Sequence, residues 1–315
     1  MRPSPRLLTT LVAACLLVPA VTLAAPFAYV PNEKSGSVSV IDTATDSVVQ
    51  TLPGGQRPRG IATDGAHLYI SEAPSNSLVV VDIGKARQIK SIKLGESPEG
   101  VSVSSDHRLI AAAVEESNSV VLLDARKRRQ IAEIKVEGDN PEHAVFSPDG
   151  RWLLVSAENA EQVDVIDVKA RRQVGSIPVG KRPRGIGFTP DGTRAYVACE
   201  LASTVYAIDM VSRKVVAEIK AGTYSNGVAM APDGSRAYVS NGKDATVSVI
   251  RTSDNQIEAT IPVGKRPWNM AVTPDGRKLY VANGRSNSVT VIDTGRLEAI
   301  AEIPVGELPW GVVIQ

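Results

Sequence analysis

Carboxylate and amide side chains recur along this sequence at multiples of about 42 residues, and they are the residue types that a hard cation binds. Calcium takes oxygen ligands from carboxylates and amides. A bound cation can also polarise an ester carbonyl and activate a water molecule. One hypothesis is therefore a calcium-dependent hydrolase of esters or lactones. The side chains that would hold the cation are Glu72, Glu158, Glu200, Asn241 and Asn283.

A second group of side chains flanks a recurring proline and could bind a partner or a ligand. Tryptophan, tyrosine and arginine dominate the energetics of protein interfaces, and this group is rich in all three. It predicts a recognition face. The competing interpretation is a solvated, charge-mixed loop surface with salt bridges between neighbouring repeats. The residues are Arg57, Arg59, Glu99, Glu142, Arg182, Arg184, Tyr224, Arg266, Trp268 and Trp310.

Other common kinds of catalytic or cofactor site have no signature in this sequence. The three histidines, His67, His107 and His143, do not fall on one face of the repeat, and each is expected to be a plain turn or surface residue. There is no Cys-x-x-Cys-His sequence for covalent haem attachment and no Gly-x-Ser-x-Gly nucleophile motif. Cys199 is expected to pack as a small apolar residue.

The elements that must position these side chains come from an internal repeat. The tripeptide Pro-Asp-Gly begins at Pro148, Pro190, Pro232 and Pro274, in steps of 42 residues. Fixed self-similarity in this range indicates an array of equal supersecondary units. Each unit reads as four short strands, because β-branched runs alternate with Pro-Asp-Gly and Asn-Gly turns. The units begin at Pro58, Pro98, Pro141, Pro183, Ser225, Pro267 and Pro309.

The two ends of the chain indicate how these units are arranged. After Pro309 there is room for one strand only, and before Pro58 there are three strands without a first one. Together they complete one unit, so the sequence predicts an all-β, seven-bladed β-propeller of four-stranded blades. The C-terminal strand would join the three N-terminal strands and close the ring. Residues 25–315 are expected to form this single domain, with the hydrolase alternative, a lactonase-like enzyme, placed at the channel mouth.

Recurring Tyr-Val segments give the sequence a family likeness. Tyr238-Val239-Ser240-Asn241, Tyr280-Val281-Ala282-Asn283 and Tyr29-Val30-Pro31-Asn32 resemble the YVTN β-propeller repeat, as do the runs 38–43 and 289–294. In size and pattern the chain is similar to the β-propeller proteins associated with PQQ-dependent catabolism. This resemblance implies a non-catalytic scaffold with a protein partner, a quinoprotein dehydrogenase or its cytochrome. PQQ would then be bound by the partner and not by this chain.

The N-terminus has the pattern of a secretory signal peptide. Arg2 and Arg6 precede an apolar run over residues 7–18, and a small-residue exit follows, so we expect cleavage after Ala24. A lipid anchor at Cys15 is the less favoured alternative. Without residues 1–24 the chain loses two arginines and its net charge becomes −1. This charge offers no general attraction to nucleic acid. One remaining cysteine and an exported chain fit a bacterial periplasm.

Overall fold

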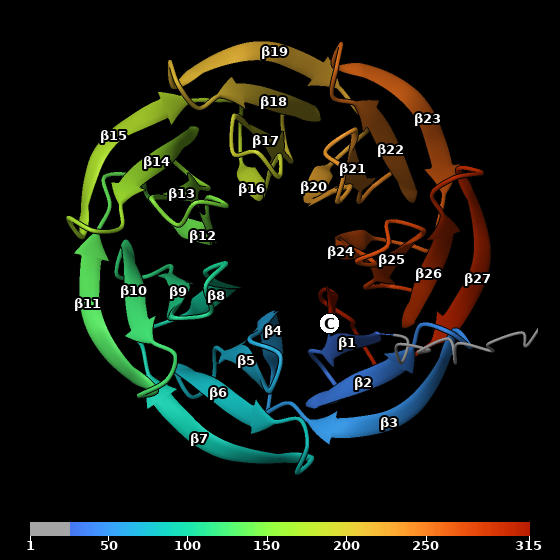
Figure 1. Ribbon diagram of the computed structural model, residues 1–315, viewed down its shortest axis with the longest axis horizontal. Coiled ribbons are helices and arrows are strands. Elements are labelled where there is room, and N and C mark those ends of the chain that lie inside the picture. The colour runs from blue at the N-terminus through green and yellow to red at the C-terminus, as the bar shows by residue number, and fades with distance from the viewer. Residues whose placement is uncertain (1–25) are drawn as a thin grey trace, which may run out of the picture.

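The computed structural model describes residues 26–315, all of whose regular elements are β-strands. The predicted signal peptide, its cleavage point and Cys15 lie outside these residues. Seven four-stranded antiparallel sheets form a ring around a central channel (Figure 1). The seven-bladed propeller predicted from the repeat is confirmed. Within the part of the chain that the structure describes, no helix is long and apolar enough to cross a membrane.

The strands follow one another from the inside of each blade to the outside, except in the blade that closes the ring. Blade 1 contains β28 (Val313–Ile314), β1 (Phe27–Asn32), β2 (Ser37–Asp42) and β3 (Ser47–Pro53). Blade 2 contains β4 (Pro58–Thr63), β5 (His67–Glu72), β6 (Ser77–Asp82) and β7 (Arg87–Lys93), and blade 3 contains β8 (Pro98–Val103), β9 (Leu109–Val114), β10 (Ser119–Asp124) and β11 (Arg129–Lys135). Blade 4 contains β12 (Pro141–Phe146), β13 (Trp152–Ala157), β14 (Gln162–Asp167) and β15 (Arg172–Pro178), and blade 5 contains β16 (Pro183–Phe188), β17 (Arg194–Cys199), β18 (Thr204–Asp209) and β19 (Lys214–Lys220). Blade 6 contains β20 (Ser225–Met230), β21 (Arg236–Asn241), β22 (Thr246–Arg251) and β23 (Gln256–Pro262), and blade 7 contains β24 (Pro267–Val272), β25 (Lys278–Asn283), β26 (Ser288–Asp293) and β27 (Glu298–Pro304).

The ring closes in blade 1, where the two ends of the domain meet. Strand β28 pairs with β1, and the backbone N–H groups of Phe27 and Gln315 donate to each other's carbonyl oxygens at 2.8 and 3.1 Å. In Figure 1 the C-terminus lies on the inner side of β1. The pairing satisfies the inner edge of β1, which would otherwise be open to association with other chains.

The core lies between the blades and consists of seven apolar clusters. The tyrosine of the second strand is fully buried in four blades, at Tyr69, Tyr196, Tyr238 and Tyr280. The hydroxyl groups of Tyr196 and Tyr280 reach an outer turn of the next blade, where they donate to the side chains of Asn255 and Asp46. These two tyrosines therefore combine a large buried ring with a satisfied polar end, which fixes neighbouring blades to each other.

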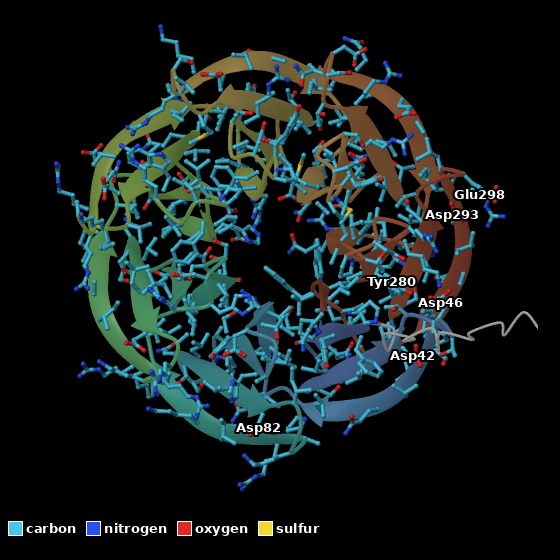
Figure 2. The ribbon with its side chains drawn as sticks, viewed as in Figure 1. Asp42, Asp46, Asp82, Tyr280, Asp293 and Glu298 are labelled. Atoms are coloured by element: carbon cyan, nitrogen blue, oxygen red, sulfur yellow. The ribbon has the colours of Figure 1, made fainter. Side chains whose placement is uncertain are left out.

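The aspartates that end the third strands stabilise the turns that follow them. The Asp42 carboxylate accepts from the Ala44 N–H at 2.7 Å, and Asp82 and Asp293 do the same for Lys85 and Gly295. Figure 2 shows the labelled Asp42, Asp82 and Asp293 in the outer part of their blades, away from the channel. Their recurrence reflects turn geometry and does not indicate a catalytic acid.

Two glycine positions explain how tightly the repeat packs. Three residues before the start of each repeat unit stands a glycine, such as Gly264, where a Cβ would come within 2.6 Å of the Asn283 side chain. Two residues after the start of the first strand, Gly60 and Gly227 approach the backbone of the next blade, and a Cβ there would lie 2.3 and 2.4 Å from a carbonyl oxygen. The first strands can therefore crowd around the axis.

Candidate functional site at the channel mouth

In blades 2 to 7 the first strand begins with a bulge that turns its side chains toward the axis. In blade 2 the register shifts between Pro58 and Ile61, and the released Gly60 N–H donates to the Ser71 hydroxyl at 2.9 Å. Blade 6 repeats this bond from Gly227 to Ser240 at 2.8 Å. Bulges of this kind re-aim a side chain. The residue after the proline therefore lies at the rim of the channel, on the face that we call the mouth face.

The residue before the proline is held in an unusual backbone conformation. Its φ is positive in six blades, although none of these residues is glycine, and this left-handed region is uncommon for other residue types. The residues are Ser97, Asn140, Arg182, Tyr224, Arg266 and Leu308, with φ between 55° and 62°. The repeat backbone thus fixes two side chains per blade at the mouth face, one on each side of the proline.

These side chains surround a cavity of about 510 Å³ at the channel mouth, which we call the mouth cavity. Every residue of the predicted recognition face lines it except Tyr224, which lies in a neighbouring pocket. Residues from all seven blades, about 40 positions apart from one blade to the next, are thus brought together, as the propeller requires. The lining comprises Glu33, Arg57, Arg59, Glu99, Glu115, Asn140, Glu142, Glu158, Arg182, Arg184, Asn226, Arg266, Trp268, Asn269, Leu308 and Trp310.

Arg184 is the centre of the charged part of the mouth cavity. Its guanidinium contacts Glu142 at 2.5 Å, Glu200 at 3.1 Å and Glu158 at 3.2 Å, and the Arg184 side chain is only 14% exposed. The three carboxylates come from blades 4 and 5, so this arginine connects two blades. Burial lowers the pKa of Arg184, but the carboxylates outweigh burial and raise it overall. The side chain is a permanent cation.

Two further groups of ion pairs extend this network around the rim. Arg59 contacts both Glu99 and Glu33, and Arg57 contacts Glu33. On the other side, the Arg266 Nη2 atom lies 2.6 Å from Glu200, and Arg182 contacts Glu158 and Glu200. Salt bridges between neighbouring blades are therefore present, as the competing interpretation expected. The carboxylates are buried, however, and do not form a solvated surface.

The carboxylates of blades 3 and 4 outnumber the arginines near them, and their pKa values reflect this. Burial, followed by repulsion from Glu142, raises the pKa of Glu99 to about 9 in spite of Arg59. Burial also raises the pKa values of Glu115 and Glu158. Glu142 is the exception, because Arg184 overcomes the effect of burial and lowers its pKa. Burial and repulsion between these carboxylates therefore oppose the ionisation of Glu99.

The residues proposed for a calcium site do not come together. Asn241 and Asn283 point into their own blades, where their amides donate to Ser248 and Thr290 at 2.9 and 2.8 Å. Glu72 accepts from the Gln56 N–H and the Ser75 hydroxyl in the same way. Only Glu158 and Glu200 of the five reach the mouth network. The carboxylate oxygens that do approach one another, within 4.8 Å, belong to Glu115, Glu142 and Glu158.

The prediction aligned Glu72 with Glu158 and Glu200, and this alignment is wrong by one residue. Glu72 occupies the last position of its second strand, as Asn32, Asn241 and Asn283 do, but the other glutamates stand one residue further along. Successive residues in a strand point to opposite faces. The position that faces the channel holds Glu33, Glu115, Glu158 and Glu200, with Ala73, Gly242 and Gly284 in the remaining blades. Glu33 was not predicted as a site residue, although its position directly after Asn32 could have identified it as one that faces the channel.

The two tryptophans lie on neighbouring blades and close one side of the mouth cavity. Trp268 covers Gly284, where a Cβ would come within 2.6 Å of the indole ring. Trp310 packs against His143, with 5.6 Å between the ring centroids. Trp310 and His143 also line a smaller cavity of about 140 Å³, which they share with Gly60, Gly100 and Asn269 of the first strands. The tryptophans are thus anchored in the channel wall.

His143 corrects one prediction. It was expected at a turn or on the surface, but it lies on β12 in the channel, at a position where five other blades have glycine. Burial lowers the pKa of His143, so its imidazole is neutral at physiological pH. His67 and His107 lie away from it, and both contact Asp64 near a turn. Cys199 is buried as expected, and burial raises the pKa of its thiol to about 12.

Comparison with known proteins supports the fold and gives a partial family match. The model of the Lactonase family, described as a 7-bladed β-propeller, matches residues 168–312. No curated protein matches the sequence. A solved structure of Kuenenia stuttgartiensis hydrazine synthase is 24% identical, with a TM-score of 0.78, and covers 90% of this chain and 99% of that chain. A functionally unknown protein from Desulfotomaculum acetoxidans DSM 771 is 16% identical, with a TM-score of 0.81, and covers 92% and 99%. The chain is therefore a seven-bladed β-propeller whose C-terminal part is similar to the Lactonase family, while its resemblance to the YVTN repeat stays a prediction.

Proposed function

We propose that this protein is a non-catalytic binding scaffold and that the mouth cavity is its recognition site. The observation that carries the proposal is the composition of this cavity. Buried glutamates are held by arginines from several blades, and two tryptophans form the opposite wall. Burying ion pairs costs desolvation free energy that packing of apolar residues would not. A rim built in this way favours a rigid, specific binding surface.

The kind of recognition follows from the groups that remain accessible. Arg57 is 53% exposed while it contacts Glu33, and Arg182 is 39% exposed. Their guanidinium groups can donate to carboxylates or carbonyl groups of a partner. Trp268 and Trp310 offer partly exposed aromatic surface beside them. Arginine and tryptophan at the centre of an interface are the residues whose truncation costs most affinity.

The partner that we propose is a periplasmic quinoprotein dehydrogenase or its cytochrome. The support is the sequence resemblance to β-propeller proteins associated with PQQ-dependent catabolism, together with the signal-peptide pattern of the first 24 residues. In this proposal the chain is exported to the periplasm. PQQ stays with the partner, and this protein carries no haem or other cofactor.

Co-purification tests this proposal. The variant Trp268→Ala/Trp310→Ala should lose the dehydrogenase from periplasmic extracts, because it removes both aromatic contacts. Trp152→Ala is the matched control, since Trp152 lies on β13 between Arg151 and Arg213, outside the mouth cavity. Circular dichroism must show that each variant is folded. Normal recovery of the dehydrogenase with the double variant would contradict the proposal.

Lactone hydrolysis is the second candidate, and two observations favour it. These are the match of residues 168–312 to the Lactonase family and the approach of Glu115, Glu142 and Glu158. Three carboxylates suit a hard cation such as calcium, although Arg184 already contacts two of them. Calorimetric titration with calcium and a lactone hydrolysis assay test this candidate. Turnover that is lost in Glu142→Gln, but kept in Glu258→Gln on an outer strand, would support it and contradict the non-catalytic proposal.

A further inference from the structure

A second pocket lies beside the mouth cavity, between loops of blades 6 and 7. It has a volume of about 450 Å³ and is formed by Tyr224, Lys243, Lys265, Arg266 and Arg285, with Gly242 and Ala245. Four of these side chains are cationic and come from three different loops. We call it the basic pocket.

Three of the four cations have no carboxylate partner among the described residues. Lys243, Lys265 and Arg285 are exposed and take part in no ion pair within residues 26–315, whereas Arg266 is paired with Glu200 at 2.6 Å. The nearby Asp244 is engaged elsewhere, because its carboxylate accepts from the Thr223 N–H at 2.6 Å. The basic pocket therefore has an excess of positive charge.

The Tyr224 ring brings two of the cations to the same place. The Lys243 Nζ atom lies 5.6 Å from the ring centroid, and the Arg266 Cζ atom lies 5.4 Å from it. Cations at such distances are attracted by the negative face of an aromatic ring. The ring thus holds two like charges in one pocket, and their mutual repulsion would be relieved by an anion.

Comparison with blade 1 shows that this charge pattern is not a property of the repeat. In blade 1 the corresponding loop residues are Lys34 and Glu307, which form an ion pair at 2.7 Å. Their backbones are joined by the Lys34 N–H bond to the Glu307 oxygen, and Arg285 and Lys265 are joined in the same way in blade 7 at 3.0 Å. Blade 7 therefore has two cations where blade 1 has a cation and an anion.

We propose that the basic pocket binds a small oxyanion that carries two or more negative charges, as a phosphate group or a polycarboxylate does. The anion supplies the charge that Glu307 supplies in blade 1, and its oxygens accept from the lysine and arginine donors. The proposal does not depend on the function of the mouth cavity, because Lys243, Lys265 and Arg285 do not line that cavity.

Calorimetric titration at low ionic strength tests the proposal, with inorganic phosphate and citrate as separate probes. The wild-type protein should bind at least one of them, and the stronger binding identifies the phosphate or the carboxylate as the natural group. The variant Lys243→Ala/Lys265→Ala should bind at least ten-fold more weakly. Lys127→Ala/Lys169→Ala is the control, because it removes two exposed lysines from β-turns outside the basic pocket and should keep wild-type affinity.

A charge-reversed variant separates a binding site from a plain basic surface. Lys265→Glu recreates the Lys34–Glu307 arrangement, now with Arg285, and should raise the Tm by about 1–3 °C while anion binding is lost. Binding of neither probe to the wild-type protein would overturn the proposal, as would equal affinity of the wild type and the double lysine variant. Neither result would bear on the tryptophan test of the mouth cavity.

Discussion

The mouth cavity has two unlike halves built on one repeated backbone. In blades 2 to 5, the charged half, the second residue of the repeat unit is Arg59, Glu99, Glu142 or Arg184. In blades 6, 7 and 1, the aromatic half, the same position holds Asn226, Trp268 and Trp310. Together the two halves give a cavity with charge on one side and aromatic rings on the other.

The difference teaches which positions of the repeat are free to vary. The glycine three residues before the inner strand cannot carry a side chain, because in blades 6 and 7 a Cβ there would meet Asn241 or Asn283 within 2.6 Å. The residues on each side of the proline have no such neighbour in common and range from arginine to tryptophan. The scaffold is thus set by a few close contacts, while the chemistry of the mouth is set independently at each blade.

The largest effect should come from removing the strand that closes the aromatic half. Deletion of residues 311–315 takes away β28, its pairing with β1 and the buried Val312. Loss of Val312 burial alone costs about 2 kcal/mol. We therefore expect the Tm to fall by at least about 5–10 °C, measured by differential scanning calorimetry. Gln315→Ala is the control and should change the Tm little; an unchanged Tm in the deletion would contradict closure through β28.

The next effect concerns the charged half. Arg184→Ala leaves the buried Glu142 without its arginine and removes one of the arginines that contact Glu158 and Glu200, which should cost about 3–5 kcal/mol of unfolding free energy. Denaturant titration measures the loss. Asn226→Ala, at the equivalent position in the aromatic half, is the matched comparison and should cost less. Equal losses in the two variants would show that the network around Arg184 is not what stabilises the charged half.

The sequence was sufficient to predict the fold because the repeat is marked at every blade. Pro-Asp-Gly turns gave the repeat length, the seven unit starts gave the number of blades, and the incomplete units at both ends indicated closure by the last strand. These marks arise from turn geometry and tight packing, which leave few alternatives. The recurring proline also located the rim, because the residues beside it face the axis in every blade.

The details of the site could not be predicted because they depend on single-residue register and on partners from other blades. Glu72 and Glu158 look equivalent in sequence, but one residue of offset sends the first into its blade and the second to the channel. His143 resembles a surface histidine until Trp310, from the far end of the chain, is placed against it. Such contacts follow from closure of the ring and have no local signal.

The smallest effect for a single unit of pH, and the sharpest test of the two halves, is a pH dependence that belongs to the charged half. The pKa of Glu99 is raised to about 9 by burial and by Glu142. A carboxyl whose folded-state pKa is raised stabilises the fold fully below its unfolded pKa, near 4.5, and loses this contribution as pH rises through the folded pKa. The wild-type protein should therefore lose up to about 1.4 kcal/mol per pH unit from this group above pH 4.5.

Glu99→Gln removes this ionisation while it keeps the side chain's size. The variant should match the wild-type Tm near pH 4.5 and exceed it increasingly as the pH rises to 9. Gln is neutral, as a protonated Glu99 is, but it cannot form the ion pair with Arg59. If that ion pair dominated, Glu99→Gln would be less stable than the wild type at pH 8. A lower Tm of Glu99→Gln at pH 8 would therefore show that the arginines balance the carboxylates of the charged half. It would contradict the raised pKa of Glu99.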